Sequence, residues 1–250
     1  AETCLSGYYD REFSDIMTKN LMDHGVKLAF GETVTELEGD GKVQTIITDK
    51  GSHEADMVVF GIGFKPNTML GQGQIKVFKN QAFLTDRKQE TSIPGVYAIG
   101  DLTADIQLAH VAAAQGTFVV ENLAGKEHSI RLEVVPNGMF VSLPIVPSCI
   151  YTTPEIATVG ITEETAKTYG MKVRVGHYSM RDNGKSIITR ADDGFIRLVF
   201  EAYSNTIVGA QMICPRATDM IGEMATAIAN GLSATQLSLA MRAHPTYSEG

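Results

Sequence analysis

The last seven residues of the chain, His244–Gly250, read HPTYSEG. The proline that follows His244 has a fixed φ angle and stiffens the backbone beside the imidazole, and Glu249 lies five residues beyond the histidine. A carboxylate that holds one imidazole nitrogen leaves the other to act as a base near neutral pH. His244 and Glu249 are therefore a candidate general base and its orienting carboxylate. From these residues alone, a simple turn is the alternative interpretation.

The composition indicates a soluble globular protein. The chain has 250 residues, of which 44% are hydrophobic and 20% charged, and its net charge is -8. An acidic chain lacks the basic footprint of nucleic-acid binding. No apolar run reaches the roughly 20 residues of a membrane span, and the first residues lack the pattern of a signal peptide. We expect neither a nucleic-acid nor a membrane partner.

The three cysteines, Cys4, Cys149 and Cys214, are widely separated and form no CxxC pair. An odd number of unpaired cysteines favours reduced thiols in a cytoplasmic protein. The pattern also excludes a cysteine-rich zinc module, so no metal site is predicted. We expect each cysteine to be a small buried hydrophobic residue and not a nucleophile.

The first part of the chain alternates between helical and extended patterns. Apolar residues at helical spacing predict a helix over 11–24, closed by Gly25. Residues 26–64 are predicted to be β-structure with a tight turn at Asp40-Gly41. Within it, residues 57–63 (MVVFGIG) form a continuous apolar run, which is typical of a strand buried on both faces.

The rest of the chain has further elements. VYAIGD, residues 96–101, is predicted to be a short buried strand that ends in a glycine and a carboxylate, and a helix of small apolar residues is predicted over 108–125. Alternating strands are predicted over 172–180 and 194–214, with turns at 193–194 and 204–205. Thr162, Thr218 and Ser233 are predicted to begin helices, Ser233 through a capping box with Gln236.

Five motifs occur in a characteristic order: GxxPNT (Gly63–Thr68), VYAIGD, QLAH (Gln107–His110), YTTPEIATVG (Tyr151–Gly160) and HPTYSE. In this order they resemble the flavin-dependent pyridine nucleotide–disulfide oxidoreductases. The resemblance covers the whole chain but only about the last half of a family subunit. It implies an α/β plus α+β fold in three parts: residues 1–68 of a Rossmann-like NAD domain, 69–138 of the FAD domain, and an α+β dimerisation domain over 139–250 with an antiparallel sheet.

The resemblance implies two cofactor sites. Asp101, preceded by Gly100, would accept a hydrogen bond from the ribityl chain of FAD. The edge of the isoalloxazine ring would be lined by Gln107, Leu108, Ala109 and His110, with a helix N-terminus that stabilises negative charge on the reduced flavin. We expect His110 itself to be packed and not catalytic. Val34 and Gly63 match positions that line the NAD site, although the residues alone are equally compatible with a core valine and a strand-ending glycine.

In dihydrolipoamide dehydrogenases, the histidine that matches His244 takes a proton from a small-molecule dithiol, and the thiolate attacks a redox-active disulfide above the flavin. Glu249 would orient His244. Family geometry also implies a cis peptide bond between His244 and Pro245. It further implies a homodimer through residues 139–250, in which His244 serves the flavin of the partner subunit.

Two parts of a complete enzyme are missing from the sequence: the GxGxxG turns that bind dinucleotide phosphates and the redox cysteine pair. We therefore expect the chain to be a fragment, inactive alone, of a dihydrolipoamide dehydrogenase-like enzyme whose N-terminal half carries these features. The first hundred residues are most similar to NADH oxidases and coenzyme A-disulfide reductases, which remain an alternative. A second alternative is a non-enzymatic dimerisation module.

Overall fold

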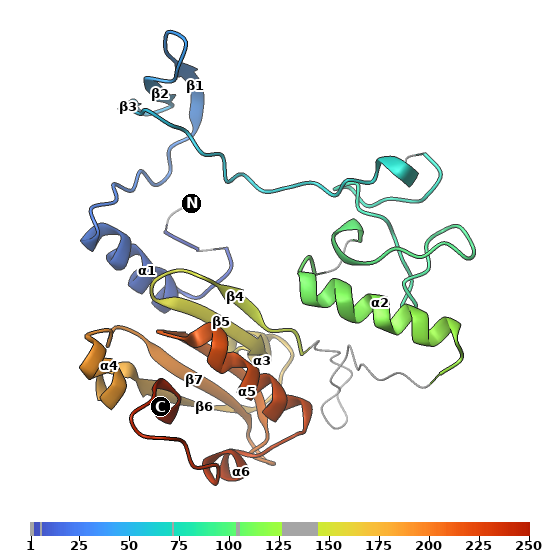
Figure 1. Ribbon diagram of the computed structural model, residues 1–250, viewed down its shortest axis with the longest axis vertical. Helices are drawn as coiled ribbons and strands as arrows, with labels where there is room; N and C mark the ends of the chain where they lie inside the picture. Colours follow the sequence, from blue (N-terminus) through green and yellow to red (C-terminus); the bar gives the residue numbers. More distant parts are fainter. Residues whose placement is uncertain (1–2, 6, 72, 104–105, 127–144) are drawn as a thin grey trace. The chain divides into compact units, whose positions relative to one another are not determined.

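The computed structural model describes residues 3–5, 7–71, 73–103, 106–126 and 145–250. Two compact units divide the chain: Ala1–Gly61 with Pro147–Gly250, and Ile62–Val146 (Figure 1). The predicted domain boundary near residue 138 lies outside the described residues, and the boundary near residue 68 stays a prediction.

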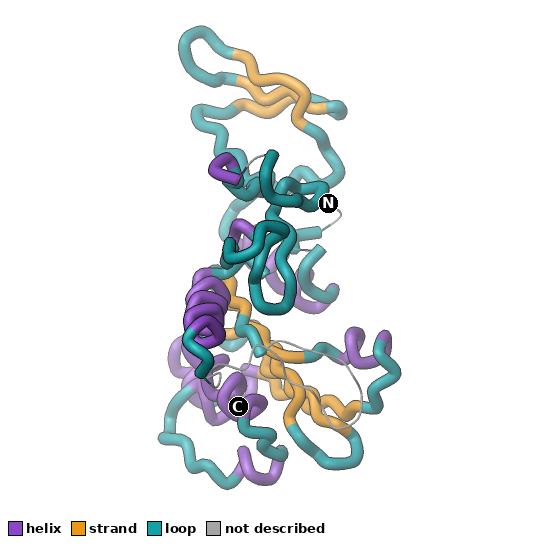
Figure 2. The backbone as a smooth tube through the Cα atoms, turned by 90° about the vertical axis from the view of Figure 1, so that its right-hand side faces the viewer, coloured by secondary structure: helices purple, strands orange, loops and turns teal. Residues whose placement is uncertain are grey.

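A five-stranded antiparallel sheet forms the centre of the first unit. Its strands lie in the order β4-β5-β8-β7-β6 and run side by side in both views (Figure 1, Figure 2). Their bounds are Ser148–Ile150 (β4), Glu155–Gly160 (β5), Val173–Ser179 (β6), Phe195–Glu201 (β7) and Ile207–Cys214 (β8). The alternating strands predicted over 172–180 and 194–214 are confirmed.

Four helices accompany this sheet: Glu163–Thr168 (α3), Gly184–Thr189 (α4), Ala217–Ala229 (α5) and Ala234–Ser238 (α6). Thr162 caps α3 by accepting a hydrogen bond from the Thr165 amide at 3.0 Å. Ser233 and Gln236 form the predicted capping box at the start of α6. Helix α6 is shorter than the predicted segment 233–244, and α4 was not predicted.

Helix α5 packs on the sheet and supplies much of its core. Ile221, Met224 and Ile228 are buried on one side of the helix, as its apolar spacing requires. The helix begins at Ala217, one residue before the predicted start. Its first turn is held by the Glu155 carboxylate of β5, which accepts hydrogen bonds from the amide and the hydroxyl of Thr218 at 2.9 and 2.6 Å. A carboxylate at this position is favoured by the helix dipole.

The predicted N-terminal helix is confirmed as α1, Arg11–Asp23, and it packs on β7. The ring of Phe13 meets that of Phe195 edge-on, with centroids 4.9 Å apart, and both rings are buried. Arg197 of β7 donates hydrogen bonds to Asp10 at 2.6 Å and to Glu12. Because Arg197 itself is mostly buried, these two acidic residues at the start of α1 compensate its charge.

A second, three-stranded antiparallel sheet contains Val34–Glu38 (β1), Thr45–Thr48 (β2) and Ser52–Glu54 (β3). The Asp40-Gly41 pair lies in the loop between β1 and β2, as predicted. Glu32 joins the ends of this sheet, because its carboxylate accepts a hydrogen bond from the Thr48 hydroxyl and pairs with His53 Nε2, both at 2.8 Å.

The predicted buried strand over 57–63 is wrong. These residues have no regular secondary structure, and Val59 and Ile62 are 83% and 87% exposed. A buried strand needs neighbouring strands to satisfy its backbone groups, and no described segment pairs with this one.

The second unit is built around helix α2, Ala109–Leu123, which confirms the predicted helix of small residues. Two short 3-10 helices, Met69–Gly71 (η1) and Gly100–Leu102 (η2), belong to the same unit. The strand predicted over VYAIGD is wrong, because in this segment only Tyr97 forms a bridge, to Glu90. Ala98 and Gly100 are nevertheless buried.

The three cysteines differ in burial. Cys214 is fully buried in β8, and desolvation raises the pKa of its thiol to about 12. Cys4 and Cys149 are half-buried, and desolvation followed by the Glu155 carboxylate raises the pKa of Cys149. The prediction of a buried hydrophobic cysteine is therefore confirmed for Cys214.

Alkylation of the native protein with iodoacetamide near pH 8 is expected to leave Cys214 unmodified. The thiolate is the reactive species, so its low population and burial slow the reaction by at least about a thousandfold relative to an exposed thiol. Peptide mass spectrometry before and after denaturation measures the labelling. Rapid native labelling of Cys214 would contradict the buried position.

Within the described ranges, none of the helices combines the length and apolar character that a membrane span requires.

Candidate active site

The HPTYSEG segment forms a compact turn after α6. The peptide bond between His244 and Pro245 is cis, as predicted, and Tyr247–Glu249 form a 3-10 turn, η4. Thr246 begins this turn with a capping box in which its amide donates a hydrogen bond to Glu249 Oε2 at 2.9 Å. The turn thus brings the histidine and the carboxylate to the same place although five residues separate them.

His244 and Glu249 form the expected pair. His244 Nδ1 lies 3.0 Å from Glu249 Oε1, and the histidine side chain is 78% exposed. With Nδ1–H donated to the carboxylate, Nε2 carries the lone pair and can accept a proton. Glu249 is less exposed than His244 and uses both carboxylate oxygens, one toward His244 and one toward Thr246. The arrangement suits a general base with an orienting acid.

Helix α4 lies against this turn. The Asn183 side-chain amide donates a hydrogen bond to the Thr246 carbonyl at 3.0 Å, and the Thr189 and Tyr247 hydroxyls lie 2.9 Å apart. Sequence reasoning missed Asn183, although asparagine is one of the residues favoured at a helix N-cap.

The hydrogen bond from the Thr246 amide, and then the contact with His244, lower the pKa of Glu249 below its usual value of 4.5. A carboxyl group with a lowered pKa in the folded state stabilises that state above pH 4.5, and this contribution is lost as the pH falls through the folded-state pKa. The melting temperature of the native protein is therefore expected to approach that of Glu249→Gln between about pH 5 and about pH 3. Thermal unfolding monitored by circular dichroism measures this, and a constant difference down to pH 3 would contradict the role of the ionised carboxylate.

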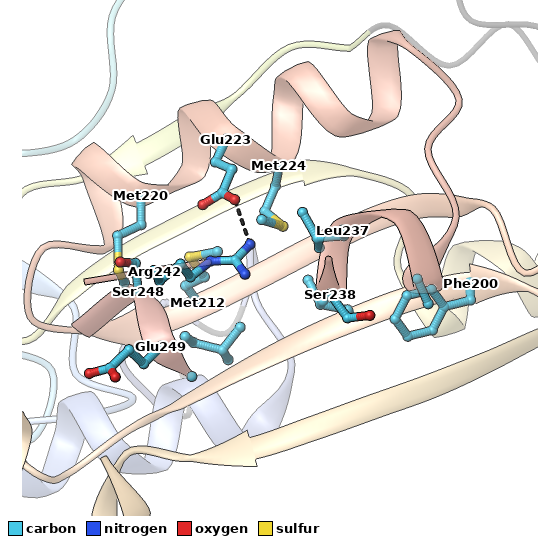
Figure 3. A pocket seen from close by; sticks show the side chains of 14 residues that line it. Phe200, Met212, Met220, Glu223, Met224, Leu237, Ser238, Arg242, Ser248 and Glu249 are labelled. Atoms are coloured by element: carbon cyan, nitrogen blue, oxygen red, sulfur yellow. Dashed lines mark hydrogen bonds and ion pairs between the residues drawn. The ribbon is translucent and has the colours of Figure 1, made fainter. Parts of the chain in front are cut away.

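An apolar cavity of about 350 Å³ lies next to this turn. Figure 3 shows the side chains that line it. Its apolar lining includes Ile196, Leu198, Phe200, Met212, Met220 and Met224. Arg242 and Glu223 form an ion pair at its wall, at 2.5 Å. Glu249 lies at the edge with its carboxylate directed away from that ion pair. His244 does not line the cavity, so the cavity is separate from the proton-accepting nitrogen.

The residues predicted to contact FAD lie together in the second unit. Gly100 has a φ of +63°, and a Cβ atom on it would be 2.7 Å from the Cβ of Ala112 in α2. Only glycine allows both this backbone conformation and this close approach. The Gly100 amide donates a hydrogen bond of 2.7 Å to the buried Gln115 side chain, and its carbonyl accepts one from Thr103. These two hydrogen bonds fix the backbone at Gly100, and the next residue, Asp101, is exposed to solvent.

Asp101 and the QLAH motif follow directly. The Asp101 side chain is exposed. The backbone carbonyl of Asp101 accepts a hydrogen bond from Gln107 Nε2 at 3.2 Å. Leu108 is the N-cap residue of α2 and has no side-chain acceptor, and Ala109 and His110 begin the helix. Sequence reasoning missed Gln115, whose contact with Gly100 depends on the fold and has no local signal.

The two residues predicted to line the NAD site lie in different units. Val34 begins β1 and is half-exposed, opposite Thr48. Gly63 has a φ of +90°, and no atom lies within 4 Å of a Cβ built on it. Among the described residues, no group of three or more histidine, cysteine or acidic side chains is placed to hold a metal ion.

Two protein-family models match the chain. Residues 1–116 match the model "Pyridine nucleotide-disulphide oxidoreductase", and residues 146–250 match the dimerisation domain of the same family. The chain belongs to the pyridine nucleotide–disulfide oxidoreductase family. This family is FAD- and NAD(P)-dependent. The predicted family is confirmed.

Curated relatives include an NADH oxidase of Streptococcus pyogenes, 41% identical over 249 residues, and a dihydrolipoyl dehydrogenase of Geobacillus stearothermophilus, 33% identical over 260 residues. The matches cover 95% and 98% of this chain but 52% and 51% of the relatives. The chain thus spans about half the length of these relatives.

Among solved structures, LpdA from Mycobacterium tuberculosis is similar to this chain, with a TM-score of 0.84 and 24% sequence identity. The match covers 97% of this chain and 51% of LpdA. The similarity confirms the predicted fold class.

Proposed function

We propose that the protein carrying this chain is an FAD-dependent oxidoreductase that passes electrons between a small-molecule dithiol and NAD. The observation that carries this proposal is the pair of His244 and Glu249, with Nδ1 and Oε1 3.0 Å apart and the ring exposed. An exposed imidazole with an oriented second nitrogen fits proton abstraction from a substrate thiol.

In this mechanism, His244 Nε2 takes the proton of one substrate thiol. The resulting thiolate attacks a protein disulfide, which forms a mixed disulfide and releases one cysteine thiolate. The second substrate thiol then closes the substrate disulfide and leaves the protein dithiol reduced. FAD, when bound, would transfer the electron pair from that dithiol to NAD. Glu249 stabilises the imidazolium while His244 holds the proton.

Features of the second unit support a flavin contact at Asp101. Its carboxylate is exposed at the end of the Gly100 turn, where a ribityl hydroxyl group can donate to it. The start of α2, at Leu108, Ala109 and His110, offers the positive end of a helix dipole to the pyrimidine edge of the flavin, next to Gln107. Val34 and Gly63 would line the NAD site, and Gly63 leaves room for the backbone to approach a ligand.

Residues 146–250 form a dimerisation domain. We infer a homodimer through the predicted interface domain, residues 139–250. In this dimer, His244 would act at the flavin site of the partner subunit. The FAD fingerprint and the redox disulfide would be supplied by an N-terminal half, so the chain by itself would lack the reaction. The predicted division into residues 1–68, 69–138 and 139–250 and the cytoplasmic location are part of this proposal.

The test is reduction of NAD by dihydrolipoamide, measured with the complete gene product that carries this chain. Formation of NADH that is lost in His244→Gln is the expected result. No NADH formation by a flavin-loaded protein would contradict the proposal.

A second candidate is an NADH oxidase, which is favoured by the 41% identity to a protein of that name. In that case NADH alone would cause oxygen consumption, and no dithiol would be needed. Because His244 has no thiol to deprotonate in that reaction, His244→Gln would retain oxygen consumption. Parallel assays with an oxygen electrode and with dihydrolipoamide distinguish the two candidates.

A further inference from the structure

Asn183 connects two parts of the candidate site through one buried side chain. It is only 1% exposed. Its Oδ1 accepts a hydrogen bond from the Ser186 amide at 2.9 Å and so caps α4, while its Nδ2 donates to the Thr246 carbonyl at 3.0 Å. The orientation of the amide is fixed by its partners, because a backbone N–H can only donate and a carbonyl can only accept.

The second of these bonds holds the turn that carries the dyad. Thr246 lies between His244 and Glu249, and its amide also binds Glu249. Among the described residues, the His244 ring has a hydrogen bond to Glu249 alone. The position of the exposed ring therefore depends on where the turn is held.

The start of α4 also lies beside the ring. A Cβ atom on Gly184 would be 3.6 Å from His244 Cε1, which is van der Waals contact. The Asn183 side chain thus holds two segments in place. One is the start of α4, which lies next to the His244 ring, and the other is the turn that carries His244.

We propose that Asn183 is a positioning residue for His244, which sets the direction of Nε2 toward the substrate thiol. The inference rests on the proposed role of His244 as the base. Asn183 would act through the turn and not on the substrate, so its loss should slow the proton-transfer step while binding of the dithiol is maintained.

Two substitutions distinguish the role of Asn183 as the N-cap of α4 from its hydrogen bond to the Thr246 carbonyl. Asn183→Ser keeps an N-cap acceptor for the Ser186 amide but is too short to reach the Thr246 carbonyl. Asn183→Asp keeps the shape and the acceptor, but it replaces the donor by an oxygen that repels the carbonyl. Asn183→Asp also buries a charge, so Asn183→Ser carries the test if the aspartate variant does not fold.

Thr162→Ala is the matched control. It removes a side-chain cap of the same kind from α3, which has six residues like α4 and lies outside the candidate site. Because Asn183→Ser keeps the cap of α4, an effect that came from helix stability alone should be at least as large in Thr162→Ala as in Asn183→Ser.

The measurements are kcat and KM for dihydrolipoamide oxidation, and NADH-dependent reduction of ferricyanide, which requires no thiol deprotonation. For Asn183→Ser, kcat is expected to fall about 10- to 100-fold, with KM within about twofold of the native value. The ferricyanide reaction should stay unchanged. Thr162→Ala should leave all three quantities unchanged.

Native kcat in Asn183→Ser, together with a loss in His244→Gln, would overturn the positioning role and leave the proposed function intact. An equal loss in Thr162→Ala would also overturn it, because the effect would then be general. A native protein that does not oxidise the dithiol, or that does so without His244, would overturn both the inference and the proposed function.

Discussion

His244→Gln is expected to lower kcat for dithiol oxidation by about 100- to 10,000-fold, the usual contribution of a general base. Glutamine keeps a polar side chain of similar size but cannot accept a proton. Because the ring is 78% exposed, its removal should leave the melting temperature nearly unchanged. Steady-state kinetics with dihydrolipoamide and NAD, combined with thermal unfolding, measure both quantities.

His53→Gln is a matched control, because His53 also pairs with a glutamate, Glu32, at 2.8 Å but lies in the separate sheet of β1–β3. Its activity should stay within about twofold of the native value, since His53 lies outside the turn that carries the candidate base. Glu249→Gln should lose less than His244→Gln, since the base remains while its orientation is weakened. Equal activity of His244→Gln and the native protein would contradict the assignment.

Gly100→Val is expected to abolish flavin binding and to lower the free energy of unfolding by about 2–5 kcal/mol. The new side chain would enter a space where even a Cβ is 2.7 Å from Ala112, at a φ of +63° that valine strongly disfavours. The turn would then move away from Gln115, and Asp101 would move with it. Titration of the apoprotein with FAD and denaturant unfolding measure the two effects.

Gly95→Val separates the two causes of this loss. Gly95 lies in the same unit and also has a positive φ, +77°, but no atom lies within 4 Å of its Cβ position. It should show only the backbone cost of about 1–2 kcal/mol and retain FAD binding. If Gly95→Val and Gly100→Val behaved alike, the close contact with Ala112 would not be responsible.

Local signals predicted much of this fold. The caps at Thr162 and Ser233, the alternating strands β6, β7 and β8 of the five-stranded sheet and the α2 helix depend on residues near one another in the sequence. The pairing of His244 with Glu249 was predictable for the same reason, since both belong to one short turn.

Features that depend on distant partners were not predicted. The apolar run 57–63 has the composition of a buried strand, but a strand also requires neighbours, which no described segment provides. Asn183 and Thr246 are 63 positions apart, and Gln115 contacts Gly100 across 15 positions. A single sequence contains no record of such contacts.

We propose that this chain contributes to an FAD-dependent oxidoreductase that reacts with NAD. The decisive measurement is the visible absorption spectrum of the complete gene product, before and after addition of NADH under anaerobic conditions. The proposal predicts an oxidised flavin band that is bleached by NADH and restored by a disulfide substrate. A colourless protein that takes up no FAD would contradict it.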